Sequence, residues 1–157
     1  RLIAKGLNCL NLQNGNPCNE CSNCQLINAG TSLDYTEIDA ASHTGVDNIR
    51  EEIIDKALYP PTTLQKKIYV IDEVHMLSKG AFNALLKTIE EPKSNVCFIF
   101  ATTEIHKVPD TIISRCQVFN YRKVPTQAMT LHLEKICKAE GLGYTLPALE
   151  TIANISE

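Results

Sequence analysis

Two short segments that are apolar almost throughout, residues 67–72 and 95–103, place the strongest constraint on the fold of this chain. A strand with one face in water alternates apolar and polar residues, whereas a strand covered on both faces does not. Between the two segments, residues 79–91 have the spacing of a helix that ends at Pro92. Strand, helix and strand in this order predict a parallel sheet with helices on both of its faces.

The alternation continues on both sides of this unit. The remaining predicted elements are the end of a helix at 2–7, a strand at 35–39, a helix at 46–57, a short helix at 109–114 and a last strand at 116–121. After the Val124-Pro125 step the apolar residues form two stripes at helical spacing. The sequence therefore predicts one domain at 1–123 and the first two helices of an all-helical domain at 124–157.

Composition limits the class of protein. The chain has 157 residues, 44% of them hydrophobic, so it can bury a core, and its longest apolar stretch is far too short to span a bilayer. Its 15 basic and 18 acidic residues give a net charge of −3, so it does not coat nucleic acid by bulk electrostatics. We expect a soluble, cytoplasmic protein with no membrane partner, although a targeting segment before Arg1 stays open.

Two carboxylates, Asp72 and Glu73, follow the first apolar segment directly. Open α/β sheets bind their ligands at the carboxyl ends of their strands. In nucleotide hydrolysis, Asp72 would hold Mg²⁺ directly or through water, because a hard cation prefers oxygen ligands, and Glu73 would orient and activate the attacking water. The alternative is a pair of acids that only solubilises a strand end, and it explains the surrounding strand and helix less well.

Four further side chains are candidates for the same site. Thr102 and Thr103 end the second apolar segment, where a hydroxyl can bind the γ-phosphate or the attacking water, or simply cap the strand. Arg115 follows a short helix and is placed to reach the nucleotide of a neighbouring subunit, although a surface salt bridge is the simpler explanation of an arginine taken alone. His75 has two interpretations that the sequence supports equally. It could couple the nucleotide state to neighbouring residues, or it could simply pack at the start of a helix.

Four of the seven cysteines, Cys9, Cys18, Cys21 and Cys24, form the pattern C-x8-C-x2-C-x2-C. Two-residue gaps let one tight turn present two thiolates to a metal, and four thiolates without a water position are typical of structural zinc. Disulfides are the alternative, but nothing in the sequence indicates an oxidising compartment. Four thiolates around Zn²⁺ carry a formal charge of about −2. We therefore expect the metal to staple a loop that lacks a core, and not to bind DNA phosphates.

Together these motifs resemble one family, the gamma/tau subunits of the bacterial DNA polymerase III clamp loader. The resemblance extends over nearly the whole chain. Its carriers are Leu7-Asn8-Cys9 with the following cysteines, the segment EIDAAS at 37–42, IDEVHML at 71–77, FNALLKT at 82–88, EEP at 90–92, ATT at 101–103 and SRC at 114–116.

The resemblance implies an AAA+ P-loop NTPase fold. This is a three-layer parallel sheet, incomplete here, with a four-cysteine zinc module at 9–24 and the start of an all-helical lid domain. It also implies the ATPase component of DNA polymerase III. In a heteropentamer with other clamp-loader subunits, this ATPase opens the sliding clamp and closes it around primed DNA, beside the polymerase core in a nucleoid-associated replisome.

The family roles can be carried over residue by residue. Asp72 and Glu73 match the Walker B pair, Thr103 (or Thr102) the first sensor and Arg115 the finger that acts in trans. The four cysteines match the zinc ligands, and ATP and Mg²⁺ are the implied cofactors of the full-length protein. The implied DNA contacts are Ser42, Thr44 and Arg50, because free N–H groups at a helix start favour phosphate.

The 157 residues contain no phosphate-binding sequence G-x-x-x-x-G-K-[ST]. In the family this loop would lie before Arg1 and a second sensor arginine after Glu157. We therefore predict that the chain alone neither binds nor hydrolyses ATP. Two alternatives remain for the parent protein. Arg115 and the cysteines argue against a DExH-type helicase, and the presence of both Glu73 and Thr103 argues against a non-hydrolysing, zinc-stapled scaffold subunit.

Overall fold

The computed structural model describes residues 1–42 and 45–156. The chain divides into two compact units, Arg1–Gln117 and Val118–Glu157. The sequence placed the boundary slightly later, after residue 123. The assignment of the two units to a nucleotide-binding domain and a lid domain stays a prediction.

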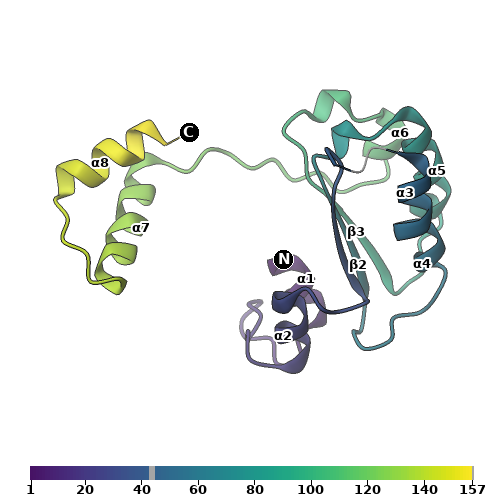
Figure 1. The fold of residues 1–157 in the computed structure, drawn as a ribbon, viewed down its shortest axis with the longest axis horizontal. Coiled ribbons are helices and arrows are strands. Elements are labelled where there is room, and N and C mark those ends of the chain that lie inside the picture. The colour runs from purple at the N-terminus through teal and green to yellow at the C-terminus, as the bar shows by residue number, and fades with distance from the viewer. Residues whose placement is uncertain (43–44, 157) are drawn as a thin grey trace. The chain divides into compact units, whose positions relative to one another are not determined.

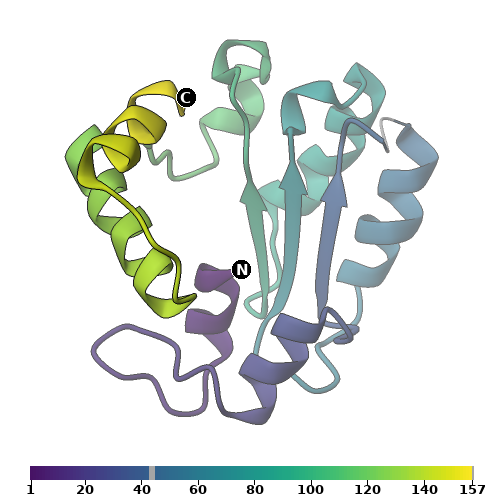
Figure 2. The same cartoon turned by 60° about the vertical axis from the view of Figure 1, so that its left-hand side comes forward.

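The first unit is built on a parallel sheet of three strands, which confirms the predicted fold class. The strands are β1 (Tyr35–Asp39), β2 (Lys67–Asp72) and β3 (Val96–Phe100), and their order in the sheet is the same as in the chain. Asp39 pairs in register with Asp72, and Ile71 pairs with Phe100 (Figure 1). Because the strands are parallel, all three end at the same edge of the sheet (Figure 2).

One face of the sheet is covered by α3 (Val46–Ile49), η1 (Arg50–Ile54), α4 (Asp55–Ala57), α5 (Lys79–Glu90) and α6 (Asp110–Ile113) (Figure 1). The first three form one continuous helical run with a π-helical middle turn, where the sequence predicted a single helix. Alternate strand residues enter this layer, so the core combines Ile38, Tyr69 and Ile71 with Ile49, Ile53, Leu85 and Ile112.

Helix α5 shows how local sequence sets these elements. Ser78 caps its start by accepting a hydrogen bond from Ala81 N at 3.2 Å, and Pro92 follows its last residues. Gly80 lets α3 approach closely, because a Cβ at this position would lie 2.7 Å from Val46 Cγ2.

The opposite face is partly covered by α1 (Leu2–Asn8) and α2 (Ser22–Ala29). Helix α2 is an addition to the sequence prediction, which found no long period in residues 8–28. A second core cluster joins the two helices to the sheet and contains Ala4, Ile27, Tyr35, Leu64 and Ile68. The parallel sheet therefore carries helices on both faces, as predicted.

The predicted strand at 116–121 is wrong, because no strand is assigned there in the described part of the chain. The apolar side chains that suggested it are exposed, with Phe119 at 65% and Tyr121 at 87%. A strand needs a partner backbone for its N–H and C=O groups, and an apolar run by itself does not supply one.

Two helices make up the second unit, α7 (Thr126–Ala139) and α8 (Leu146–Ile155), as the apolar stripes predicted. Leu149 and Ala153 of α8 are buried. Gly141, at φ 66°, allows the chain to turn after α7, where Leu142 N donates to Cys137 O at 2.9 Å. None of the described helices combines the length and apolar character needed to cross a membrane.

A buried carboxylate, Asp34, anchors the loop that leads into β2. Its oxygens accept hydrogen bonds from the backbone N–H groups of Thr62, Thr63 and Leu64 at 2.7–3.0 Å. Burial raises the pKa of this carboxyl, but the hydrogen bonds from Leu64, Thr63 and Thr62 outweigh burial and leave the pKa below its usual value. Asp34 therefore stabilises the fold in its charged form.

We expect Asp34→Asn to lower the free energy of unfolding at pH 7 by about 3 kcal/mol, because an amide nitrogen would face backbone donors in a buried site. Urea unfolding measures the loss, and Asp55→Asn on the exposed surface of α4 is the matched control. Because the folded-state pKa is lowered, the contribution of Asp34 is complete above the unfolded-state pKa. The difference between wild type and variant must shrink as the pH falls through the folded-state pKa. An equal difference at all pH values would contradict this role.

Candidate nucleotide and metal sites

The carboxyl end of β2 turns sharply at Glu73, which has a left-handed backbone at φ 47° and ψ 44°. This conformation costs a residue other than glycine about 1 kcal/mol or more, and such strain is concentrated at functional sites. The turn is held by Val74 N, which donates to Ala101 O beyond the end of β3 at 3.0 Å, and it leads into η2 (Val74–Met76). The strand ends of β2 and β3 are therefore fixed against each other.

Asp72 lies exposed at this edge, beside Asp39 of β1. Its Oδ1 accepts a hydrogen bond from Glu73 N at 2.9 Å. Asp39 accepts hydrogen bonds from Ala41 N at 2.8 Å and Ser42 Oγ at 3.0 Å. An exposed carboxylate at the end of a central strand suits a hard cation, so Asp72 could hold Mg²⁺.

Glu73, His75 and the two threonines form one cluster of polar contacts. Thr103 Oγ1 donates to Glu73 Oε2 at 3.3 Å. His75 Nδ1 lies 3.3 Å from the same Glu73 oxygen and 2.9 Å from Thr102 Oγ1. The structure thus brings together four candidate side chains from the segments that follow β2 and β3. The sequence left coupling and packing open for His75, and its ring lies against Thr102 and Glu73.

Arg115 follows α6 and is bound within its own chain. Its Nη2 lies 2.5 Å from Glu90 Oε1 at the end of α5, and its Nη1 donates to Thr111 O at 2.7 Å. The side chain is 37% exposed. This salt bridge is the simpler of the two interpretations drawn from the sequence, and the role in trans stays a prediction.

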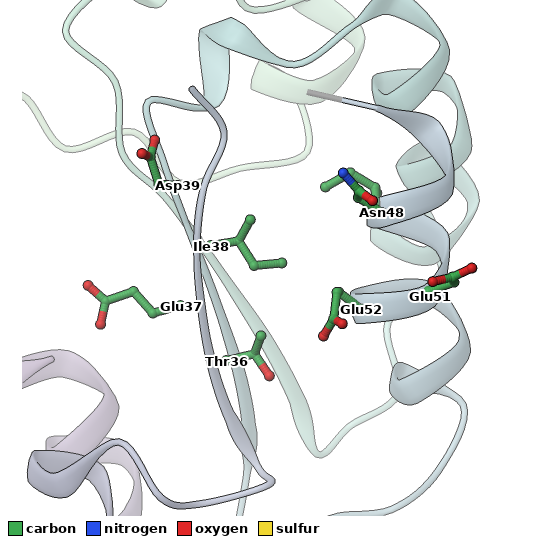
Figure 3. Close-up of a pocket in the computed structure, with 8 residues that line it drawn as sticks. Thr36, Glu37, Ile38, Asp39, Asn48, Glu51 and Glu52 are labelled. Carbon is green, nitrogen blue, oxygen red and sulfur yellow. The ribbon is translucent and has the colours of Figure 1, made fainter. Parts of the chain in front are cut away.

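The predicted DNA contacts lie near the start of the helical run that follows β1. Ser42 is exposed and donates to Asp39, Arg50 is exposed in η1, and Thr44 lies outside the described residues. A cavity of about 350 Å³ separates this run from β1, and Figure 3 shows its lining side chains on the two elements. The Glu52 carboxylate points toward β1, whereas those of Glu37 and Asp39 point away from the helical run, and none of the eight lining residues is basic, so we do not place a nucleotide or DNA phosphate in this cavity (Figure 3).

The four cysteines predicted to bind zinc lie together at the junction of α1 and α2. All four Sγ atoms are within 4.8 Å of one another, and those of Cys9 and Cys18 are 3.5 Å apart. Zn–S bonds of about 2.3 Å in a tetrahedron separate the sulfurs by roughly 3.8 Å. The cysteine cluster (Cys9, Cys18, Cys21 and Cys24) therefore fits a tetrahedral metal ion.

Backbone groups prepare two of these thiols for ionisation. A hydrogen bond from the Cys18 backbone lowers the pKa of Cys9, and one from the Leu10 backbone lowers the pKa of Cys21 to about 6. Burial raises the pKa of Cys24 to about 12. Metal ligation requires thiolates, so a metal ion would compete with protons for the four sulfurs. This competition would be strongest at Cys24, whose raised pKa makes its proton the hardest to displace.

Local sequence shapes the loop between the first two cysteines. Asn14 and Gly15 have φ values of 48° and 81°, and Gln13 and Asn16 exchange two backbone hydrogen bonds across them. This is the two-residue hairpin turn that Asn-Gly favours.

Two buried asparagines tie the cysteine cluster to the sheet, and the sequence pattern did not identify either. Asn23 Nδ2 donates to Asn8 O at 2.8 Å, and Asn8 Oδ1 accepts from Lys66 N at 2.8 Å just before β2. In the sequence, Asn8 stands out only as part of the family segment Leu7-Asn8-Cys9. The signal that was available is its place directly before Cys9, at the end of α1.

Comparison with known proteins places these features in a family. The family described as "DNA polymerase III, delta subunit" matches residues 1–125. The DNA polymerase III subunit tau of Bacillus subtilis is 50% identical over 157 residues, which are 100% of this chain and 28% of that protein. The chain thus spans less than a third of that relative's length.

Solved structures show the same fold. A DNA polymerase III gamma subunit-related protein of Thermotoga maritima has 29% sequence identity and a TM-score of 0.56, covering 68% of this chain and 37% of its own. A RuvB mutant of the same organism has a TM-score of 0.62 over 83% of this chain and 43% of its own, and at 14% identity it shares the fold alone.

The parallel sheet, its acidic strand end and these structural relatives define the class, an AAA+ protein. Within that class, the chain belongs to the family of DNA polymerase III subunits that matches residues 1–125. These relatives support the predicted polymerase subunit and give no support to the helicase alternative.

Proposed function

We propose that this chain is the Walker B, first-sensor and arginine-finger part of a clamp-loader ATPase. In the complete gene product this ATPase would load the sliding clamp onto primed DNA. The observation that carries the proposal is the contact between Glu73 and Thr103 beside the exposed Asp72, because it joins an acceptor, a hydroxyl and a cation ligand at one sheet edge. Membership of the DNA polymerase III family supports the same conclusion.

Each side chain has a distinct task in this scheme. Asp72 would hold Mg²⁺, which neutralises the charge of the phosphates when bound. Glu73 accepts a hydrogen bond from water and orients it in line with the γ-phosphate, and Thr103 fixes the Glu73 carboxylate. The lysine and backbone cradle of a phosphate-binding loop are not among the 157 residues.

The chain alone is therefore expected neither to bind nor to hydrolyse ATP measurably, whereas the complete gene product does both. Calorimetric titration with Mg·ATP and a phosphate-release assay on the two proteins test this. Tight ATP binding by the 157-residue chain would contradict the assignment. An upstream gene sequence without G-x-x-x-x-G-K-[ST] would contradict the ATPase itself.

Arg115 is proposed to leave Glu90 and stabilise the transition state in a neighbouring subunit. We expect Arg115→Ala in the complete protein to lower kcat by about a thousandfold with unchanged ATP affinity, because fingers act on the transition state. The control is Glu90→Gln, which removes the intrachain partner and should leave kcat within about twofold. Equal losses in both variants would show that the salt bridge, and not the finger, matters.

The remaining assignments follow from the same proposal. The metal at the cysteine cluster would be structural Zn²⁺, and the partners would be other clamp-loader subunits, the sliding clamp, primed DNA and the polymerase core. The site of action would be the cytoplasmic replisome at the nucleoid. Ser42, Thr44 and Arg50 stay the proposed contacts to the DNA backbone.

A further inference from the structure

His75 occupies the centre of the network at the strand ends. Its side chain is only 6% exposed, although it lies between two partly exposed glutamates. Nδ1 is 2.9 Å from Thr102 Oγ1 and 3.3 Å from Glu73 Oε2, and Nε2 is 3.9 Å from Glu104 Oε1. The ring therefore contacts side chains from both strand ends that form the proposed ATPase site.

The chemistry of its neighbours selects the protonation state of Nδ1. An ionised Glu73 carboxylate can only accept hydrogen bonds, so an unprotonated Nδ1 would place two lone pairs opposite each other at 3.3 Å. Thr102 Oγ1 already accepts a hydrogen bond from Glu104 N at 3.0 Å and retains a second lone pair. A proton on Nδ1 can be donated to Thr102 Oγ1 at 2.9 Å, and it also attracts the Glu73 Oε2 atom 3.3 Å away.

With that proton, Glu73 Oε2 accepts a hydrogen bond from Thr103 Oγ1 and has the Nδ1–H group of His75 as an electrostatic neighbour at 3.3 Å. Among residues 1–42 and 45–156, the hydrogen bond from Thr103 goes to Oε2 and none is found to Glu73 Oε1, and the Glu73 side chain as a whole is 38% exposed. The arrangement fixes one oxygen of the carboxylate and leaves the other available. A base that must align a water needs this orientation.

We infer that His75 is a positioning residue that orients the Glu73 carboxylate through Nδ1 and couples it to Thr102. The inference rests on the proposed function, because Glu73 is the base only in an ATPase. In this inference only Nδ1 of the ring orients Glu73, and Nε2 has no part in it. A histidine that merely filled space beneath the turn would not depend on which nitrogen carries the proton.

This dependence on one nitrogen provides a matched set of variants. His75→Asn keeps a donor near the position of Nδ1, His75→Gln keeps one near Nε2, and His75→Leu keeps neither. In the complete protein we expect the Leu and Gln variants to lose at least about tenfold in kcat, because misplacing a catalytic group costs up to about a hundredfold. The KM for ATP should change by less than about twofold, and the Asn variant should recover most of the rate.

A second measurement on the 157-residue chain does not depend on activity. Long-range ¹H–¹⁵N NMR of the His75 ring should show Nδ1 protonated, and Glu73→Gln should shift the Nδ1 resonance. Equal rates for the Asn and Leu variants at equal Tm, or an Nδ1 that carries no proton, would overturn the inference. If the wild-type complete protein shows no turnover, the proposed function fails, and the NMR result alone decides whether His75 holds Glu73.

Discussion

The Glu73→Gln substitution is expected to lower kcat for ATP hydrolysis by the complete protein by about a thousandfold. The reason is that an amide no longer accepts a hydrogen bond from the attacking water in the way a carboxylate does. Because Asp72 and the phosphate contacts are unchanged, ATP should bind with nearly wild-type affinity. Phosphate release under steady-state conditions and titration with a fluorescent ATP analogue measure the two quantities separately.

The matched control is Glu91→Gln, which changes an exposed acid at the end of α5 in the same way. It should leave both kcat and ATP affinity unchanged. A Glu73→Gln variant that hydrolyses ATP within about threefold of wild type would remove Glu73 from the mechanism. A variant that loses ATP binding as well would show that the substitution disturbs the strained turn rather than the chemistry.

Loss of one ligand from the cysteine cluster has the second large expected effect. Structural zinc contributes on the order of 10 kcal/mol of binding free energy that is also folding free energy. Cys21→Ser should therefore reduce bound zinc from about one equivalent to a small fraction and unfold residues 8–28. The sheet should remain folded, because its larger core lies on the opposite face.

Metal analysis of protein purified without added zinc measures the stoichiometry, and hydrogen exchange locates the unfolding. Cys137→Ser, in α7 of the second unit, is the control and should retain the metal. Less than about half an equivalent of zinc in the wild-type chain would count against the structural site. Protection lost throughout β1 to β3 would show that the cysteine cluster supports the whole first unit.

The sequence predicted those parts of the fold in which the local pattern and the final environment agree. Strand β2 is apolar and mostly buried because helices lie on both faces of the sheet, β3 is apolar but only partly buried, and α5 begins at a capping serine and ends before a proline. The strand-end side chains were predictable for the same reason, since parallel strands end at one edge. The contact between Glu73 and Thr103 follows from that geometry.

The features that the sequence did not predict depend on contacts between distant residues. Asp34 binds a loop about thirty positions further along the chain, and its neighbours in sequence give no sign of this. Residues 116–121 have the composition of a strand but form none, and 117–121 are exposed, because composition does not provide a pairing partner. The sequence leaves packing and coupling open for His75, and its contacts with Thr102 and Glu73 join two segments that are distant in the chain.

The central claim is that the acidic strand end belongs to an ATPase that loads a sliding clamp. Steady-state ATP hydrolysis by the assembled complex, with and without clamp and primed DNA, tests it most directly. We expect clamp and primed DNA together to raise the rate by about tenfold or more, and the Glu73→Gln complex to show no such rise. An unchanged rate with clamp and primed DNA, or duplex unwinding without a clamp, would contradict it.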